Sequence, residues 1–180
     1  GDEVAHAPHL AVSATPWSGS VALYSSSSDD SYALSDVIAS RSIVGQTETP
    51  MAWSRPGVWD DGVPIQIKLL NGALEARETT AILNGANLAA IGDGSSGNWE
   101  LFQFQNAELV AEDTYQLTGR LRGQGGSDGI VPAVWPAGSW FVFMDGTPAQ
   151  IDLASAQRRI ARHFRIGPAR RGYDDPSYTH

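Results

Sequence analysis

The residues that could do acid–base or thiol chemistry are few, and their spacing does not bring them together. Adjacent carboxylates occur at Asp29-Asp30, Asp60-Asp61 and Asp174-Asp175. Neighbouring side chains on a strand point to opposite faces, so none of these pairs forms a catalytic dyad by itself. The chain contains no cysteine, which excludes thiol catalysis and Cys-based zinc sites. We therefore expect no catalytic residues and no enzymatic activity.

Histidines and Asp/Gly turns are the remaining candidates for a metal site. His6 and His9 could share a metal only on a helix, and Pro8 disfavours a helical conformation for the residue before it. Asp93 and the Asp60-Asp61 pair could offer oxygens to calcium, but neither segment has the ligand spacing of an EF-hand. The simpler interpretation is that both are turns. We expect no metal and no cofactor.

Six tryptophans are a second unusual feature of the sequence. Trp53 and Trp59 lie in a segment rich in proline and glycine, where exposed rings could form a platform that stacks on glycans. The alternative is that the tryptophans fill the core or a subunit interface, because aromatic side chains dominate both settings. We favour core or interface.

The net charge of −8 argues against a nucleic-acid partner, because phosphate binding needs clustered cations. Arginines nevertheless gather near the C-terminal end, where Arg158, Arg159, Arg162 and Arg165 form a candidate patch for an anionic partner such as lipopolysaccharide, phosphate or an acidic subunit. The alternative, which we favour, is a solvated face whose arginines pair with carboxylates elsewhere in the chain.

Strands are the elements predicted to hold these residues. Residues 65–69 alternate between apolar and polar types, and Asn71-Gly72 follows them with a strong hairpin signal. In residues 99–105 the two phenylalanines share one face with Glu100, and we expect this face to point inward. Residues 115–121 are expected to pair with residues 140–144, whose two apolar faces suggest burial on both sides.

Helix candidates are limited to residues 72–80 and 152–163. Periodicity does not decide the second segment, and we favour a strand over residues 161–166. Many short strands with Gly, Asn and Asp turns predict an all-β, mainly antiparallel fold, a sandwich or barrel, with at most one or two short helices.

The length of 180 residues suits a single β-rich domain over residues 1–180, with 1–16 as a linker or the edge of a preceding domain. The chain starts with Gly1-Asp2-Glu3 and lacks the features of a signal peptide, and its apolar runs are much shorter than the roughly 20 residues of a membrane span. We expect a piece of a larger protein without membrane insertion.

The Arg120-Leu121-Arg122-Gly123 segment has a structural interpretation. Two arginines on one face of a strand can fork onto carboxylates or carbonyls of a neighbouring element. The glycines that follow could cradle a phosphate only if they led into a helix, and Pro132 argues against one.

Four motifs in a fixed order carry a family resemblance. They are residues 83–92 (LNGANLAAIG), 99–104 (WELFQF), 114–126 (TYQLTGRLRGQGG) and 135–138 (WPAG). In this order they resemble the large baseplate or tail-tip (tail-hub) protein of gene transfer agents and siphophage-like particles. The residues that characterise the motifs are Asn84, Gly85, Asn87, Trp99, Arg120, Arg122, Gly123 and Gly126.

The resemblance implies a structural domain of a phage-like tail tip or baseplate, which acts in particle assembly and host attachment without chemistry of its own. The implied partners are other tail or baseplate subunits and a host surface polysaccharide, in a trimer within a virion tail assembled in the bacterial cytoplasm. The resembling protein also has a hydrolase-like TIM barrel elsewhere, which this chain does not carry. The alternative function is a carbohydrate-binding module that recognises glycans of the host envelope.

Overall fold

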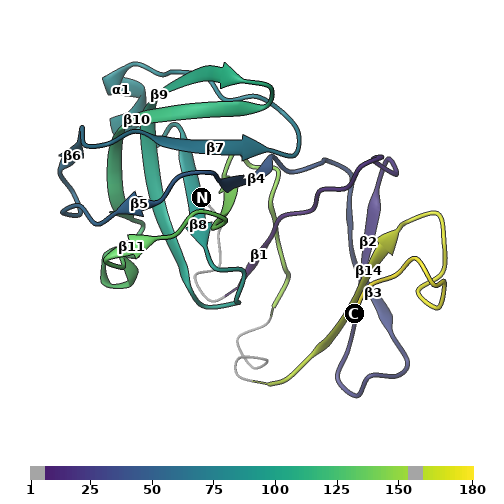
Figure 1. The fold of residues 1–180 in the computed structure, drawn as a ribbon. Helices are drawn as coiled ribbons and strands as arrows, with labels where there is room; N and C mark the ends of the chain where they lie inside the picture. The colour runs from purple at the N-terminus through teal and green to yellow at the C-terminus, as the bar shows by residue number, and fades with distance from the viewer. Residues whose placement is uncertain (1–6, 154–159) are drawn as a thin grey trace. The chain divides into compact units, whose positions relative to one another are not determined.

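The computed structural model describes residues 7–153 and 160–180 (Figure 1). The chain divides into two compact units. The barrel unit is the continuous segment Ile43–Asp145, and the sheet unit combines Gly1–Ser42 with Gly146–His180. Each unit is described by itself.

The barrel unit is built on a closed ring of six antiparallel strands. In order around the ring these strands are β10 (Thr114–Gln124), β7 (Ile65–Leu69), β4 (Val44–Thr47), β12 (Trp140–Phe143), β8 (Leu88–Gly92) and β9 (Trp99–Ala111), and β9 pairs with β10 to close it. The short strand β6 (Trp59–Asp60) also pairs with β10, while β5 (Met51–Ala52) and β11 (Val134–Trp135) form a separate two-stranded sheet. The predicted antiparallel all-β class is confirmed, in its barrel form.

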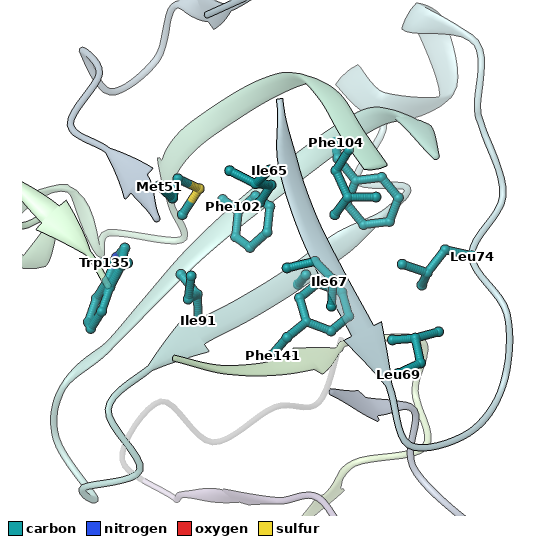
Figure 2. Close-up of a cluster of buried hydrophobic side chains, with 12 residues drawn as sticks. Met51, Ile65, Ile67, Leu69, Leu74, Ile91, Phe102, Phe104, Trp135 and Phe141 are labelled. Carbon is teal, nitrogen blue, oxygen red and sulfur yellow. The ribbon is translucent and has the colours of Figure 1, made fainter. Parts of the chain in front are cut away.

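Aromatic and aliphatic side chains fill the barrel (Figure 2). Phe102 and Phe104 on β9 are both fully buried, which confirms the prediction that their face of the strand points inward. The ring of Phe102 meets the ring of Phe141 edge-on, with 6.3 Å between centroids. Gly45 permits the close approach of β4 to β7, because an added Cβ would collide with the backbone carbonyl of Lys68.

The predicted pairing of residues 115–121 with residues 140–144 is wrong. Strand β10 pairs with β9 and β7, whereas β12 lies between β4 and β8. The reason is local: β9 and β10 are consecutive and are joined by a tight turn in which Asp113 has a φ of 53°. Their long pairing occupies one edge of β10, and β7 and β6 share the other.

The hairpin expected at Asn71-Gly72 is also wrong, as is most of the helix expected over residues 72–80. After β7 the chain has no regular secondary structure until it reaches α1 (Thr79–Leu83) at the end of that range. Two contacts fix this segment against the barrel: Leu74 is buried in the barrel core, and the backbone N–H of Arg77 donates to the carbonyl of Gln105 at 2.9 Å. The other helical turn of the barrel unit is the 3₁₀ helix η1 (Asp128–Ile130).

The sheet unit contains a three-stranded antiparallel sheet in the order β14 (His163–Pro168), β2 (Val21–Ser26) and β3 (Ala33–Ile38). A second pair joins β1 (His9–Leu10) to β13 (Ala149–Gln150). The strand predicted over residues 161–166 is confirmed from His163 onward. The alternative helix candidate, residues 152–163, includes residues 154–159, which lie outside the described residues. Val12, Val21 and Ile38 form the small core of this unit.

Candidate functional site

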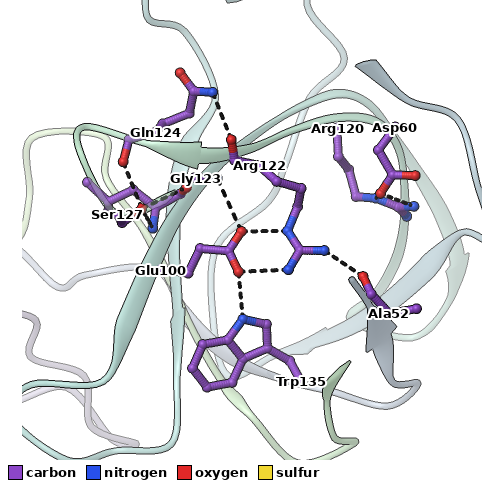
Figure 3. Close-up of polar contacts among 10 residues, drawn as sticks. Ala52, Asp60, Glu100, Arg120, Arg122, Gly123, Gln124, Ser127 and Trp135 are labelled. Atoms are coloured by element: carbon purple, nitrogen blue, oxygen red, sulfur yellow. Dashed lines mark hydrogen bonds and ion pairs between the residues drawn. The ribbon is translucent and has the colours of Figure 1, made fainter. Parts of the chain in front are cut away.

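The most densely connected polar group in the barrel unit is the ion pair between Glu100 on β9 and Arg122 on β10 (Figure 3). Both side chains are 0% exposed. Arg122 Nε donates to Glu100 Oε1 at 2.5 Å, and Nη2 donates to Oε2 at 2.7 Å. This two-point geometry is the strong form of an arginine–carboxylate contact.

A change of register in β10 accompanies this pairing. The β9–β10 pairing shifts register between Leu121 and Gln124, and Gly123, within this bulge, has a φ of 64°. Positive φ is readily adopted by glycine and strained for other residues. Gly123 also donates its backbone N–H to Glu100 Oε1 at 3.3 Å, so the bulge contributes directly to the site.

Two further contacts connect the ion pair to the small β5–β11 sheet. Trp135 Nε1 on β11 donates to Glu100 Oε2 at 2.7 Å, and Arg122 Nη1 donates to the carbonyl of Ala52 on β5 at 2.7 Å. Each oxygen of Glu100 thus accepts two hydrogen bonds, which fills the acceptor positions of a carboxylate. The geometry supports a structural role: it joins four strands through one buried, fully paired carboxylate.

A second ion pair joins Arg120 on β10 to Asp60 on β6. Arg120 Nε and Nη2 both donate to Asp60 Oδ2, at 3.0 and 2.9 Å, and Nη1 donates to the carbonyls of Val63 and Leu117. Burial alone would raise the pKa of Asp60. The backbone N–H of Gly62, the Arg120 guanidinium and the Ser54 side chain outweigh it, so the pKa of Asp60 lies below its ordinary value.

A pocket of about 290 Å³ lies beside this second pair. It is lined by Pro50, Ala52, Trp53, Asp60, Gly62, Val63, Arg120 and Val134. Trp53 is 56% exposed, whereas Trp59 on β6 is half-buried and is not among the lining residues. The structure places Trp53 beside Asp60 and Arg120 in this pocket.

The other motif residues shape turns and local contacts. Asn84 caps the C-terminal end of α1, and Gly85 and Gly126 have φ values of 96° and 82°. Buried Asn87 has a φ of 52° and donates from Nδ2 to the carbonyls of Glu75 and Phe104, so it fixes the chain between α1 and β8. Trp99 Nε1 donates to the Ser95 carbonyl.

The candidate anionic-partner patch is described only in part, because Arg158 and Arg159 lie outside the described residues. Arg162 Nη2 donates to Ser25 Oγ at 2.8 Å. The Arg165 guanidinium lies 4.5 Å from the centre of the Tyr32 ring, and its Nη1 donates to the Tyr173 carbonyl. Both described arginines thus contact groups of the sheet unit itself.

The described residues contain neither a cluster of metal ligands nor a membrane-spanning helix. Among residues 7–153 and 160–180, no three His, Asp or Glu side chains gather in a way that could hold a metal ion. Within the same residues, no helix is long and apolar enough to cross a bilayer.

The fold and the ion pairs define an antiparallel β-barrel domain with an apolar core and two buried ion pairs. The family model described as Rcc01698-like, C-terminal, matches residues 42–142, nearly the whole barrel unit. The chain therefore belongs to the Rcc01698-like C-terminal family. No curated protein matches it.

Asp93 and Asp175 are expected to stay ionised at pH values below the ordinary aspartate pKa. Hydrogen bonds from Asn98 and Ser95 lower the pKa of Asp93 to about 2, and hydrogen bonds from Ser177 and Arg171 lower the pKa of Asp175 to about 2. Because the folded pKa lies below the unfolded one, the contribution to stability is present above the unfolded pKa and is lost as pH falls towards 2.

Replacing Asn98 by Ala should raise the pKa of Asp93 towards its ordinary value, as measured by NMR titration of the carboxyl carbon. Asp175 lies in the sheet unit and serves as the internal control, because its pKa should not move. An unchanged Asp93 titration in this variant would contradict the expected role of Asn98.

Proposed function

We propose that this chain is a structural domain of the tail-tip or baseplate protein of a phage-like particle of the gene transfer agent type, where it acts in particle assembly and host attachment. The observation that carries the proposal is the family match over the barrel unit, since this family is found in gene transfer agent-related proteins. The order of the four sequence motifs supports the same assignment. Its partners would be other tail subunits, in a trimer within the virion tail.

The physical character of the barrel unit supports an assembly role. Two buried ion pairs and a closed ring of strands give a rigid scaffold, in which every ring strand has neighbours on both sides. A closed ring has no free edge for unwanted pairing. Near the tip of the β9–β10 hairpin, however, Leu109 is 61% exposed and Val110 is also exposed. Exposed apolar side chains at one place are typical of protein–protein contact surfaces.

Replacing Leu109 by Glu in the full-length tail protein is expected to reduce its incorporation into particles by at least about tenfold, the effect of losing roughly 1.4 kcal/mol of contact free energy. The measurement is the amount of tail protein that co-sediments with particles on a density gradient. The melting temperature of the 180-residue chain should change by less than about 2 °C, because the side chain is exposed.

Leu83 on α1 provides the matched control, because it is 67% exposed and lies in another part of the barrel unit. Replacing Leu83 by Glu should leave incorporation unchanged. Normal incorporation of the Leu109 variant would argue against a hairpin-tip contact, and complete absence of the unmodified protein from particles would refute the assembly proposal itself.

A second candidate function is binding of glycans of the host envelope, either within the same tail or as an independent module. The observation that favours it is the exposed Trp53 ring on the wall of a pocket that also contains charged groups. Aromatic rings on loops carried by a rigid scaffold are suited to ligand binding.

A further inference from the structure

We propose that the Trp53 pocket, defined by the eight lining residues given above, binds a single neutral sugar ring between the Trp53 side chain and the Asp60–Arg120 pair. The inference rests on the glycan-binding candidate and adds to it the class of ligand and the contacts. It differs from the two-tryptophan platform that the sequence offered as an alternative, because the site is built from one tryptophan and one ion pair.

Apolar side chains form the wall of this pocket. Trp53 and Val134 are exposed, and Val63 is 83% exposed, although all three line the same cavity. Removing apolar surface from water is favourable in proportion to its area, so a ligand with an apolar face gains free energy here. The C–H face of a sugar ring is such a surface, and an indole ring offers a broad, flat partner for it.

The ion pair gives the pocket a polar group with unused hydrogen-bonding capacity. Asp60 Oδ1 accepts the backbone N–H of Gly62 at 3.0 Å, and a hydrogen bond from the Ser54 side chain also stabilises this carboxylate. Arg120 has five N–H donors and uses four of them, on Asp60, Val63 and Leu117. One N–H donor of Arg120 Nη2 therefore remains beside the carboxylate.

This combination selects a neutral sugar over other ligand classes. A purely apolar ligand would bury the remaining Arg120 donor without a partner, which costs free energy. An anionic ligand would meet a carboxylate that is already matched by its arginine, so the pair offers no net positive charge. A sugar hydroxyl can accept from the remaining N–H of Arg120 while the face of the ring stacks on Trp53.

The size of the pocket limits the ligand to one ring. Its volume of about 290 Å³ lies just below the range of roughly 300–1,000 Å³ that is typical of small-molecule sites. Gly62 keeps access to the ion pair open. A Cβ at this position would lie 2.9 Å from Asp60 Oδ1 and 3.9 Å from Arg120 Nη2, and would cover the polar side of the pocket.

The test is saturation-transfer NMR on the 180-residue chain with the methyl glycosides of glucose, galactose and mannose, each at about 10 mM, a concentration suited to millimolar affinities. We expect transfer to the ring protons of at least one glycoside. Replacing Trp53 by Ala should reduce it by at least about tenfold, while Trp53→Phe should retain most of it. Trp140→Ala is the matched control, because Trp140 is also exposed but does not line the pocket.

Gly62→Ala should abolish binding while the melting curve stays close to that of the unmodified chain. Several results would overturn the proposal: no transfer to any of the three glycosides, equal transfer to cyclohexanol, or preference for methyl glucuronide. The assembly proposal is tested separately, because full-length protein with Trp53→Ala should still enter particles. Loss of incorporation in that variant would instead identify the pocket as a subunit contact.

Discussion

Replacing Glu100 by Gln is expected to lower the free energy of unfolding of the chain by about 3–5 kcal/mol, the usual effect of breaking a fully buried ion pair from one side. Arg122 would keep its charge at a position that is 0% exposed, without a counter-charge. The new amide nitrogen would also face two N–H donors: Arg122 Nη2 and Trp135 Nε1 if it replaces Oε2, or Arg122 Nε and the Gly123 backbone N–H if it replaces Oε1. Guanidinium denaturation followed by tryptophan fluorescence measures the change.

A double variant provides the control for this prediction. Glu100→Leu combined with Arg122→Met removes both charges, and such apolar replacements are often close to neutral, so the double variant should be more stable than Glu100→Gln alone. A loss below about 1 kcal/mol in Glu100→Gln would contradict the structural role of the pair, because it would place the cost in the range of exposed ion pairs.

Replacing Phe102 by Ala is expected to lower the free energy of unfolding by about 3–5 kcal/mol, because it leaves a cavity in a core that cannot fully collapse. Phe102 is fully buried and its ring contacts those of Phe104 and Phe141. The same denaturation experiment measures the change. Leu109→Ala, on the exposed end of the same strand, should change stability by no more than about 0.5 kcal/mol.

A small effect of Phe102→Ala would mean that the barrel interior is not packed as described. The Phe102 and Glu100 effects are not expected to add, because the two side chains lie two residues apart on the inward face of β9. Neighbouring residues that share packing partners commonly show coupling. Measuring the combined variant would give the size of that coupling.

The parts of the fold that could be predicted from the sequence are those set by local periodicity. The alternation in β9 places Phe102, Phe104 and Glu100 on the buried face, as expected, because successive side chains of a strand point to opposite sides. Strand pairing is not local in this way. The neighbours of β10 and β12 depend on how six strands close into a ring. The residue pattern within either strand does not indicate which strands will be its neighbours.

The same limit applies to the ionic contacts. The sequence indicates that Arg120 and Arg122 can bind carboxylates, but Arg120 lies 60 positions after Asp60 in the chain. These two residues meet because they are direct partners in the β6–β10 register. The Glu100–Arg122 pair coincides with a bulge at Gly123, and its position follows from the completed pairing of β9 with β10.

The order of segments along the chain has a consequence for how the molecule folds. The sheet unit is made of two separate pieces, and β14 must find β2 across the whole barrel sequence. If the barrel sequence were a disordered loop, pairing β14 with β2 would carry an entropic cost that grows with the length of that loop. In the folded barrel, the N–H of Phe143 donates to the carbonyl of Ile43 at 3.0 Å, so the chain enters and leaves at one place. Barrel folding thus shortens the effective loop, and the sheet unit is expected to form after it.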